Sequence, residues 1–222
     1  LVFVQTFGRY VDPWHHYRPA WYYLQVMATL WLPAVLLLPW TIGRWAGALR
    51  ERDARVLLPL GFAVVYLLFF TASSGKRDLY ILSALPMLAL PMGYLLPELW
   101  RNPGVQRVLA GFTVFVSLLC VAAWVYLVHV DAARGARLLA AGGIDGFAPL
   151  LVTGAAGLAL VAVLQMRAAH LALAGFLIVA WQVAGWWVFP AIDGARSARD
   201  FIARLETMAD PKRELGLLAY HE

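Results

Sequence analysis

Long apolar runs, separated by short polar stretches, divide most of this chain. Each run is close to the roughly 20 residues that an α-helix needs to cross the hydrocarbon core of a bilayer. The runs predict six transmembrane helices, at about residues 21–40, 56–71, 80–96, 108–130, 147–166 and 171–190. We therefore expect residues 1–190 to form an all-α polytopic membrane domain.

The last part of the chain, residues 191–222, follows a different pattern. Residues 197–205 carry apolar side chains at the spacing of an amphipathic helix, and Pro211 cannot continue that helix. Residues 215–220 then have the composition of a strand. This order predicts a helix and a strand that open a small soluble α/β domain on the outer side of the membrane.

The positive charges predict which loops face the cytoplasm. Residues 41–55 carry four arginines in one short polar stretch, which is the clearest positive-inside signal in the chain. With this loop inside, residues 73–79 and residues 131–146 lie outside. The outside segments before the tail nevertheless hold six cations, which are Arg9, Arg18, Lys76, Arg77, Arg134 and Arg137. So many cations outside run against the usual bias and suggest that an anion binds at the outer leaflet.

One polar stretch, Ser73–Tyr80, stands between two long apolar runs and holds two adjacent cations, Lys76 and Arg77. This placement concentrates positive charge where a lipid headgroup would lie. Lysine offers a point charge and arginine a planar fork of donors, and both suit a phosphate. The alternative is that the two residues are interfacial anchors, which most membrane helices carry.

The composition agrees with a membrane protein. Hydrophobic residues make up 62% of the 222 residues and charged residues only 14%, whereas soluble domains are about half apolar and about a quarter charged. The net charge of +5 does not indicate nucleic acid as a partner, because no RNA- or DNA-binding motif accompanies it. Cys120 is the only cysteine, so the chain can form neither an internal disulfide nor a thiolate metal cluster.

Three short segments carry a resemblance to a known family. In order, they are Phe7–Tyr10, His16–Tyr23 and Phe69–Leu82. They resemble the aminoarabinose transferase branch of bacterial integral-membrane glycosyltransferases, whose wider family includes the protein O-mannosyltransferases. The resemblance implies the GT-C fold and a polyprenyl-phosphate sugar donor, such as one on undecaprenyl phosphate. It also implies transfer to a lipid or protein acceptor at the outer face of the bacterial cytoplasmic (inner) membrane.

The resemblance also suggests site residues. It places Arg9 and Tyr80 near the donor phosphate, and Lys76 matches the lysine that precedes this tyrosine in the family. The neighbouring candidates are Arg77, His16 and Arg18. The family often has a proline after the lysine, where this chain has Arg77-Asp78.

The resemblance implies an aspartate as catalytic base in the first outer loop of the family, and no segment here matches that loop. We therefore assign no catalytic residue. The chain begins at Leu1 rather than at a methionine, so we expect a piece of a longer protein that is inactive alone. Some family members carry histidines that could bind a divalent metal, but Val4 and Thr6 stand at those positions here. We therefore assign no metal ligand and no cofactor.

Two other functions compete with the glycosyltransferase reading. A transporter or a lipid-binding membrane module would show a polar site near the middle of the membrane. The predicted spans hold almost no ionisable residues, which argues against transport. A purely structural anchor for the soluble tail would leave the outside cations without a reason.

Overall fold

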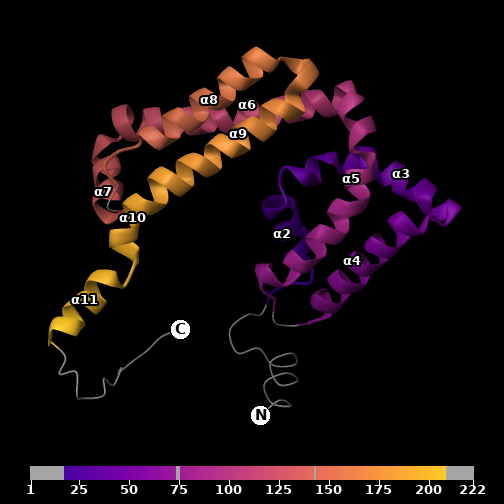
Figure 1. The fold of residues 1–222 in the computed structure, drawn as a ribbon, viewed down its shortest axis with the longest axis horizontal. Coiled ribbons are helices and arrows are strands. Elements are labelled where there is room, and N and C mark those ends of the chain that lie inside the picture. Colours follow the sequence, from indigo (N-terminus) through magenta and orange to yellow (C-terminus); the bar gives the residue numbers. More distant parts are fainter. Residues whose placement is uncertain (1–17, 74–75, 143, 209–222) are drawn as a thin grey trace, which may run out of the picture. The chain divides into compact units, whose positions relative to one another are not determined.

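The structure is a computed structural model that describes residues 18–73, 76–142 and 144–208 (Figure 1). The described residues form helices and turns, without a strand. They divide into two compact units. Unit 1 holds the chain up to Phe112 together with Met166–His170, and unit 2 holds Thr113–Gln165 and the chain from Leu171 onward. The strand expected at residues 215–220 lies outside the described residues, so the soluble α/β domain stays a prediction.

Unit 1 begins with a helix that is broken where a continuous span was expected. Helix α2 (Tyr22–Leu30) gives way to a 3-10 turn (Ala34–Leu37), and α3 (Leu38–Glu51) follows with a bend of 96° between the two parts. Pro33 explains the break, because its ring clashes with the preceding turn and it donates no hydrogen bond. At roughly 1.5 Å per residue, α2 is about 14 Å long, or half of a bilayer core. The expected span over residues 21–40 therefore corresponds to a bent pair of helices, and its path through the membrane stays a prediction.

Helix α3 also occupies most of the segment that was expected to be an arginine-rich loop. It ends where Arg52 takes a left-handed conformation with φ of 55°. The Asp53 carboxylate then caps α4 (Ala54–Ala72) by accepting a hydrogen bond from the Arg55 amide at 3.0 Å. Hydrogen bonds from the Arg55 side chain and amide lower the pKa of Asp53. The expected loop over residues 41–55 is therefore mostly helix, and only a tight turn separates α3 from α4.

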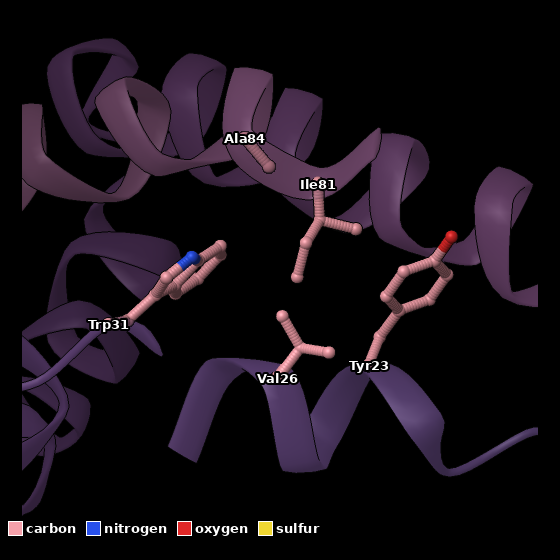
Figure 2. Packing of buried hydrophobic residues seen from close by; sticks show 5 residues of the cluster. All are labelled: Tyr23, Val26, Trp31, Ile81 and Ala84. Atoms are coloured by element: carbon pink, nitrogen blue, oxygen red, sulfur yellow. The ribbon is translucent and has the colours of Figure 1, made fainter. Parts of the chain in front are cut away.

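Two apolar helices pass beside α2 to complete unit 1. They are α4 and the continuous stretch formed by a 3-10 turn (Asp78–Ala84) and α5 (Leu85–Arg101). Tyr23, Val26 and Trp31 from the α2 segment pack against Ile81 and Ala84 of the 3-10 turn, and all five are buried (Figure 2). This core holds the end of α4 and the start of α5 against α2.

Unit 2 consists of the later helices. Helix α6 (Pro103–Val125) starts in unit 1 and continues in unit 2 through a π-helical turn (Tyr126–Val130). The helices that follow are α7 (Ala132–Gly142), α8 (Ala148–Leu164), α9 (Ala169–Val183) with a second π-helical turn (Ala184–Val188), α10 (Phe189–Arg196) and α11 (Arg199–Met208). Helix α7 replaces the loop expected over residues 131–146.

The number of membrane-spanning helices is close to the expected six. Four stretches of the described chain are long and apolar enough to cross a bilayer, namely Ala54–Ala72, Asp78–Arg101, Pro103–Val130 and Met166–Asp193. The bent pair α2–α3 makes a fifth if it counts as one span. Helix α8 is apolar but has only 17 residues. An all-α polytopic membrane protein is therefore confirmed, with four or five candidate spans.

Candidate functional site

The polar stretch after α4 is organised around the buried ammonium group of Lys76. This side chain is only 5% exposed. Its Nζ donates to the carbonyl oxygen of Ser73 at 2.5 Å and to the carbonyl oxygen of Arg18 at 3.2 Å. Ser73 follows the last residue of α4, where helix carbonyls lack partners within the helix and where a positive charge is favoured. Lys76 therefore caps α4 and ties its end to a residue 58 positions earlier.

The backbone of Arg18 lies beside Lys76, and its side chain turns to an aromatic ring. Its carbonyl accepts the hydrogen bond from Lys76, while its guanidinium lies 5.7 Å from the centre of the Tyr22 ring. A cation over an aromatic face is attracted by the negative face of the ring. The Tyr22 ring in turn lies 5.4 Å from the ring of Tyr23, which belongs to the buried core. The start of α2 thus fixes Arg18 next to the polar stretch.

Tyr80 lies one turn further along the chain, inside the 3-10 turn. Its amide donates to the Arg77 carbonyl at 3.2 Å, and its ring lies 5.3 Å from the Phe70 ring. The Tyr80 side chain remains 41% exposed. Arg77 is also exposed. The ring of Tyr80 is therefore held by packing while its outer part can reach a ligand.

The structure brings together four of the six residues that the sequence suggested. Lys76 contacts the backbone carbonyl of Arg18, and Arg77, the next residue, accepts the hydrogen bond from the Tyr80 amide. Arg9 and His16 lie outside the described residues. Within the part of the chain that the structure describes, no group of three His, Cys, Asp or Glu side chains could hold a metal ion. The arrangement supplies positive charge and hydrogen-bond donors, which suits an anion.

A row of aromatic side chains leads to this site and was not predicted. The Phe62 and Tyr66 rings are 5.5 Å apart, the Tyr66 and Phe70 rings 4.8 Å, and Phe70 then meets Tyr80. The signal was present in the sequence, because three of these residues recur every fourth position along α4 and such residues share one face of a helix. The row forms a line of aromatic side chains along α4 that ends at the polar site.

The comparisons with known proteins find bacterial transferases. Part of the chain is similar to proteins named undecaprenyl phosphate-alpha-4-amino-4-deoxy-L-arabinose arabinosyl transferase. The identity is 34% over 124 residues for one from Pseudomonas fluorescens, covering 55% of this chain and 21% of the relative. It is 42% over 91 residues for one from Sodalis glossinidius, covering 40% of this chain and 16% of the relative. For one from Pseudomonas aeruginosa it is 36% over 119 residues, covering 50% of this chain and 20% of the relative.

The matches are partial. The chain spans about a fifth of the length of the curated relatives that it matches. No protein-family model matches the chain, and no solved structure does. The resemblance to the aminoarabinose transferases, first seen in three short segments, is confirmed for about half of this chain.

Proposed function

We propose that this chain is part of a membrane glycosyltransferase that takes a sugar from an undecaprenyl-phosphate donor. The acceptor is a lipid or a protein on the outer side of the bacterial cytoplasmic membrane. The observation that carries the proposal is the similarity to relatives whose names state an undecaprenyl-phosphate-linked aminoarabinose. The adjacent cations Lys76 and Arg77, with the backbone of Arg18 in contact with Lys76, support it, because positive charge stabilises a donor phosphate.

The chemistry explains why cations are needed. When the bond between the sugar and the phosphate breaks, the phosphate keeps the electron pair and gains negative charge. Donors and cations already in place stabilise this charge as it develops. We assign this role to Arg9, Lys76 and Tyr80, with Arg77, Arg18 and His16 as neighbours. Within the described residues, Lys76 uses two of its three N–H donors on carbonyl oxygens, which leaves one donor and the charge for the phosphate.

The aromatic row on α4 fits the other end of the donor. An isoprenoid chain is apolar and unsaturated, and it would lie along Phe62, Tyr66 and Phe70 with its phosphate beside Tyr80. Phe62 is 48% exposed and Tyr80 41% exposed, so the two ends of the row are open to a ligand. We assign no catalytic base. We propose that it lies in a part of the relatives that this chain does not match, and that the 222 residues alone transfer no sugar.

The donor site is tested by substitutions in the full-length protein. Arg9→Ala should lower transfer from an undecaprenyl-phosphate sugar by roughly ten- to a hundredfold, because a charge-assisted contact contributes on the order of 1.5–3 kcal/mol. Arg9→Lys should restore only part of the rate, since the planar fork is lost. Tyr80→Phe should also lower the transfer rate. It keeps the ring contact with Phe70 and removes only the hydroxyl, so the fall in rate measures the contribution of that hydroxyl.

The matched control is Arg101→Lys, an exposed position at the end of α5. It should keep the parent rate at equal expression. Wild-type rates in both Arg9→Lys and Tyr80→Phe would show that neither residue touches the phosphate.

The proposed sidedness is tested by cysteine labelling of intact cells. In a Cys120→Ala background, a membrane-impermeant maleimide should label Ser74→Cys, because the polar stretch faces outward. It should not label Arg50→Cys, which is exposed on α3 on the proposed cytoplasmic side. Permeabilised cells give the full label at both positions as a reference. Labelling of Arg50→Cys alone in intact cells would mean that the topology is the reverse of the proposed one.

A further inference from the structure

Helix α7 lies where a membrane boundary is expected. It follows the 28-residue apolar stretch Pro103–Val130, and α8 begins shortly after it. Figure 1 shows α7 at the end of α6, running across the direction of α6 and α8. If α6 crosses the bilayer, α7 therefore lies in the interfacial layer, where phospholipid headgroups are found. Helix α7 belongs to unit 2, whereas the residues around Lys76 belong to unit 1.

The orientation of α7 is fixed at its first turn. Asp131 accepts a hydrogen bond from the Arg134 amide at 2.9 Å, and its own amide donates to the Tyr126 carbonyl at 2.8 Å. Gly135 is buried against the end of α6, where a Cβ atom would collide with the Leu127 carbonyl oxygen. Gly135 therefore marks the side of α7 that packs against the protein, while Arg134, Arg137 and Ala141 are exposed.

The exposed surface of α7 combines two arginines with an apolar side chain. Arg134 and Arg137 are exposed, and Leu138 is 48% exposed. Arg134 and Leu138 are four residues apart, so they are neighbours on one helix face. Among the described residues, the ion pairs involve neither of these arginines. Two guanidinium groups beside a leucine at the end of a span match the lipid interface, with cations at the phosphates and the apolar group in the acyl layer.

We propose that α7 is an interfacial helix that binds the phosphate headgroups of acidic phospholipids through Arg134 and Arg137. Guanidinium forks pair well with phosphate oxygens, and an acidic headgroup adds a net charge that a zwitterionic one lacks. Leu138 enters the acyl region and sets the depth of α7 in the membrane. This binding is independent of sugar transfer, so it holds whether or not the proposed function is correct.

The test places an environment-sensitive fluorophore on the same side of α7. Ala141→Cys, in a Cys120→Ala background, lies four residues after Arg137 and is exposed. The full chain is reconstituted in nanodiscs of phosphatidylcholine with and without phosphatidylglycerol. Two quenchers then report the position of the probe, a nitroxide near the headgroup end of the lipid acyl chain and iodide in the water. Phosphatidylglycerol should raise quenching by the lipid and lower quenching by iodide.

Variants show which side chains carry the effect. Arg134→Gln with Arg137→Gln should reduce the ratio of lipid-facing to water-facing probe by about tenfold in phosphatidylglycerol, given that each basic residue contributes to attraction by an anionic surface. Lysine at both positions should keep part of it, because the charge remains. Arg101→Gln with Arg107→Gln removes the same charge outside α7 and should leave the quenching of the probe by lipid and by iodide unchanged.

Three outcomes overturn the proposal. The first is equal quenching with and without phosphatidylglycerol in the parent chain. The second is protection of the probe from both quenchers in every lipid, which would mean that protein covers this face. The third is that inorganic phosphate, added to phosphatidylcholine discs, protects the probe from iodide as well as phosphatidylglycerol does. That result would mean a site for a free anion rather than a lipid-binding surface.

Discussion

Replacing Lys76 with methionine should lower the free energy of unfolding of the chain by about 3 kcal/mol, because two carbonyl oxygens lose a charged donor. Methionine keeps an unbranched apolar stem of similar length and removes only the ammonium group. The Ser73 carbonyl belongs to a residue that is 4% exposed, so water cannot easily replace the lost hydrogen bond. The Arg18 carbonyl belongs to an exposed residue and can be hydrated again, which limits the total. Denaturant titration of the detergent-solubilised chain, followed by tryptophan fluorescence, measures the change.

The neighbouring cation provides a matched control for Lys76. Arg77→Met removes one positive charge from the next position, but Arg77 is exposed. We expect a smaller loss than for Lys76→Met, because an exposed guanidinium is hydrated in the folded chain whereas the Lys76 ammonium is buried. Equal losses for the two variants would mean that stability depends on the charge of the whole stretch and not on the two hydrogen bonds of Lys76. The free energy of unfolding of Lys76→Arg should lie between those of the parent and Lys76→Met, since the larger planar group of arginine must fit the same buried space.

The sequence located the polar stretch but not the way in which it is held. Two adjacent cations between apolar runs predicted an anion-binding site, and the structure places Lys76 and Arg77 between the end of α4 and the 3-10 turn that holds Tyr80. The burial of Lys76 could not be predicted. Its partners are backbone carbonyls, one of them 58 residues away, and every residue type carries such a carbonyl. A pattern of side chains therefore gives no sign of this contact.

Two elements differ from those expected from the sequence, and each difference has a physical explanation. Pro33 was visible, but a proline inside an apolar run can either be accommodated by neighbouring helices or end the helix. Only the packing decides between these two results. Helix α7 could have been predicted, because Asp131 is a favourable N-cap residue and is followed by a short amphipathic segment. The length of the polar segment instead suggested a loop.

Small residues allow close packing of helices in unit 2. Gly157 of α8 lies against Ser117 of α6 and Phe176 of α9. A Cβ atom at this position would collide with the Ser117 hydroxyl and lie 2.7 Å from a carbon of the Phe176 ring. One turn earlier, a Cβ at Gly154 would lie 2.7 Å from the Ser117 carbonyl oxygen. The three helices therefore meet at a point where α8 has no room for a side chain, as is common for helices in membranes.

Replacing Gly157 with leucine should prevent stable packing of α6, α8 and α9. Extra methylene groups in a well-packed interior typically cost about 1–3 kcal/mol and occasionally more, and a leucine here meets atoms from two helices at once. We expect a loss above about 4 kcal/mol, close to the whole stability of many domains. The variant should therefore not accumulate as a monodisperse protein in detergent, which size-exclusion chromatography of a fluorescent fusion measures. Gly111→Leu is the matched control, since nothing lies within 4 Å of its Cβ position on α6.

A milder pair of substitutions tests the same contact without abolishing folding. Gly157→Ala should destabilise the chain by about 1–3 kcal/mol through its collision with the Ser117 hydroxyl. The buried Ser117 hydroxyl has no hydrogen-bond partner within the described residues, so Ser117→Ala alone should cost little. Combined with Gly157→Ala, it removes the colliding oxygen, and the double variant should be more stable than Gly157→Ala by about 1 kcal/mol. The rescue should be partial, because the Phe176 ring still borders the new methyl group. If the effects of the two substitutions simply add, with no coupling between them, then α6 and α8 do not pack through this pair.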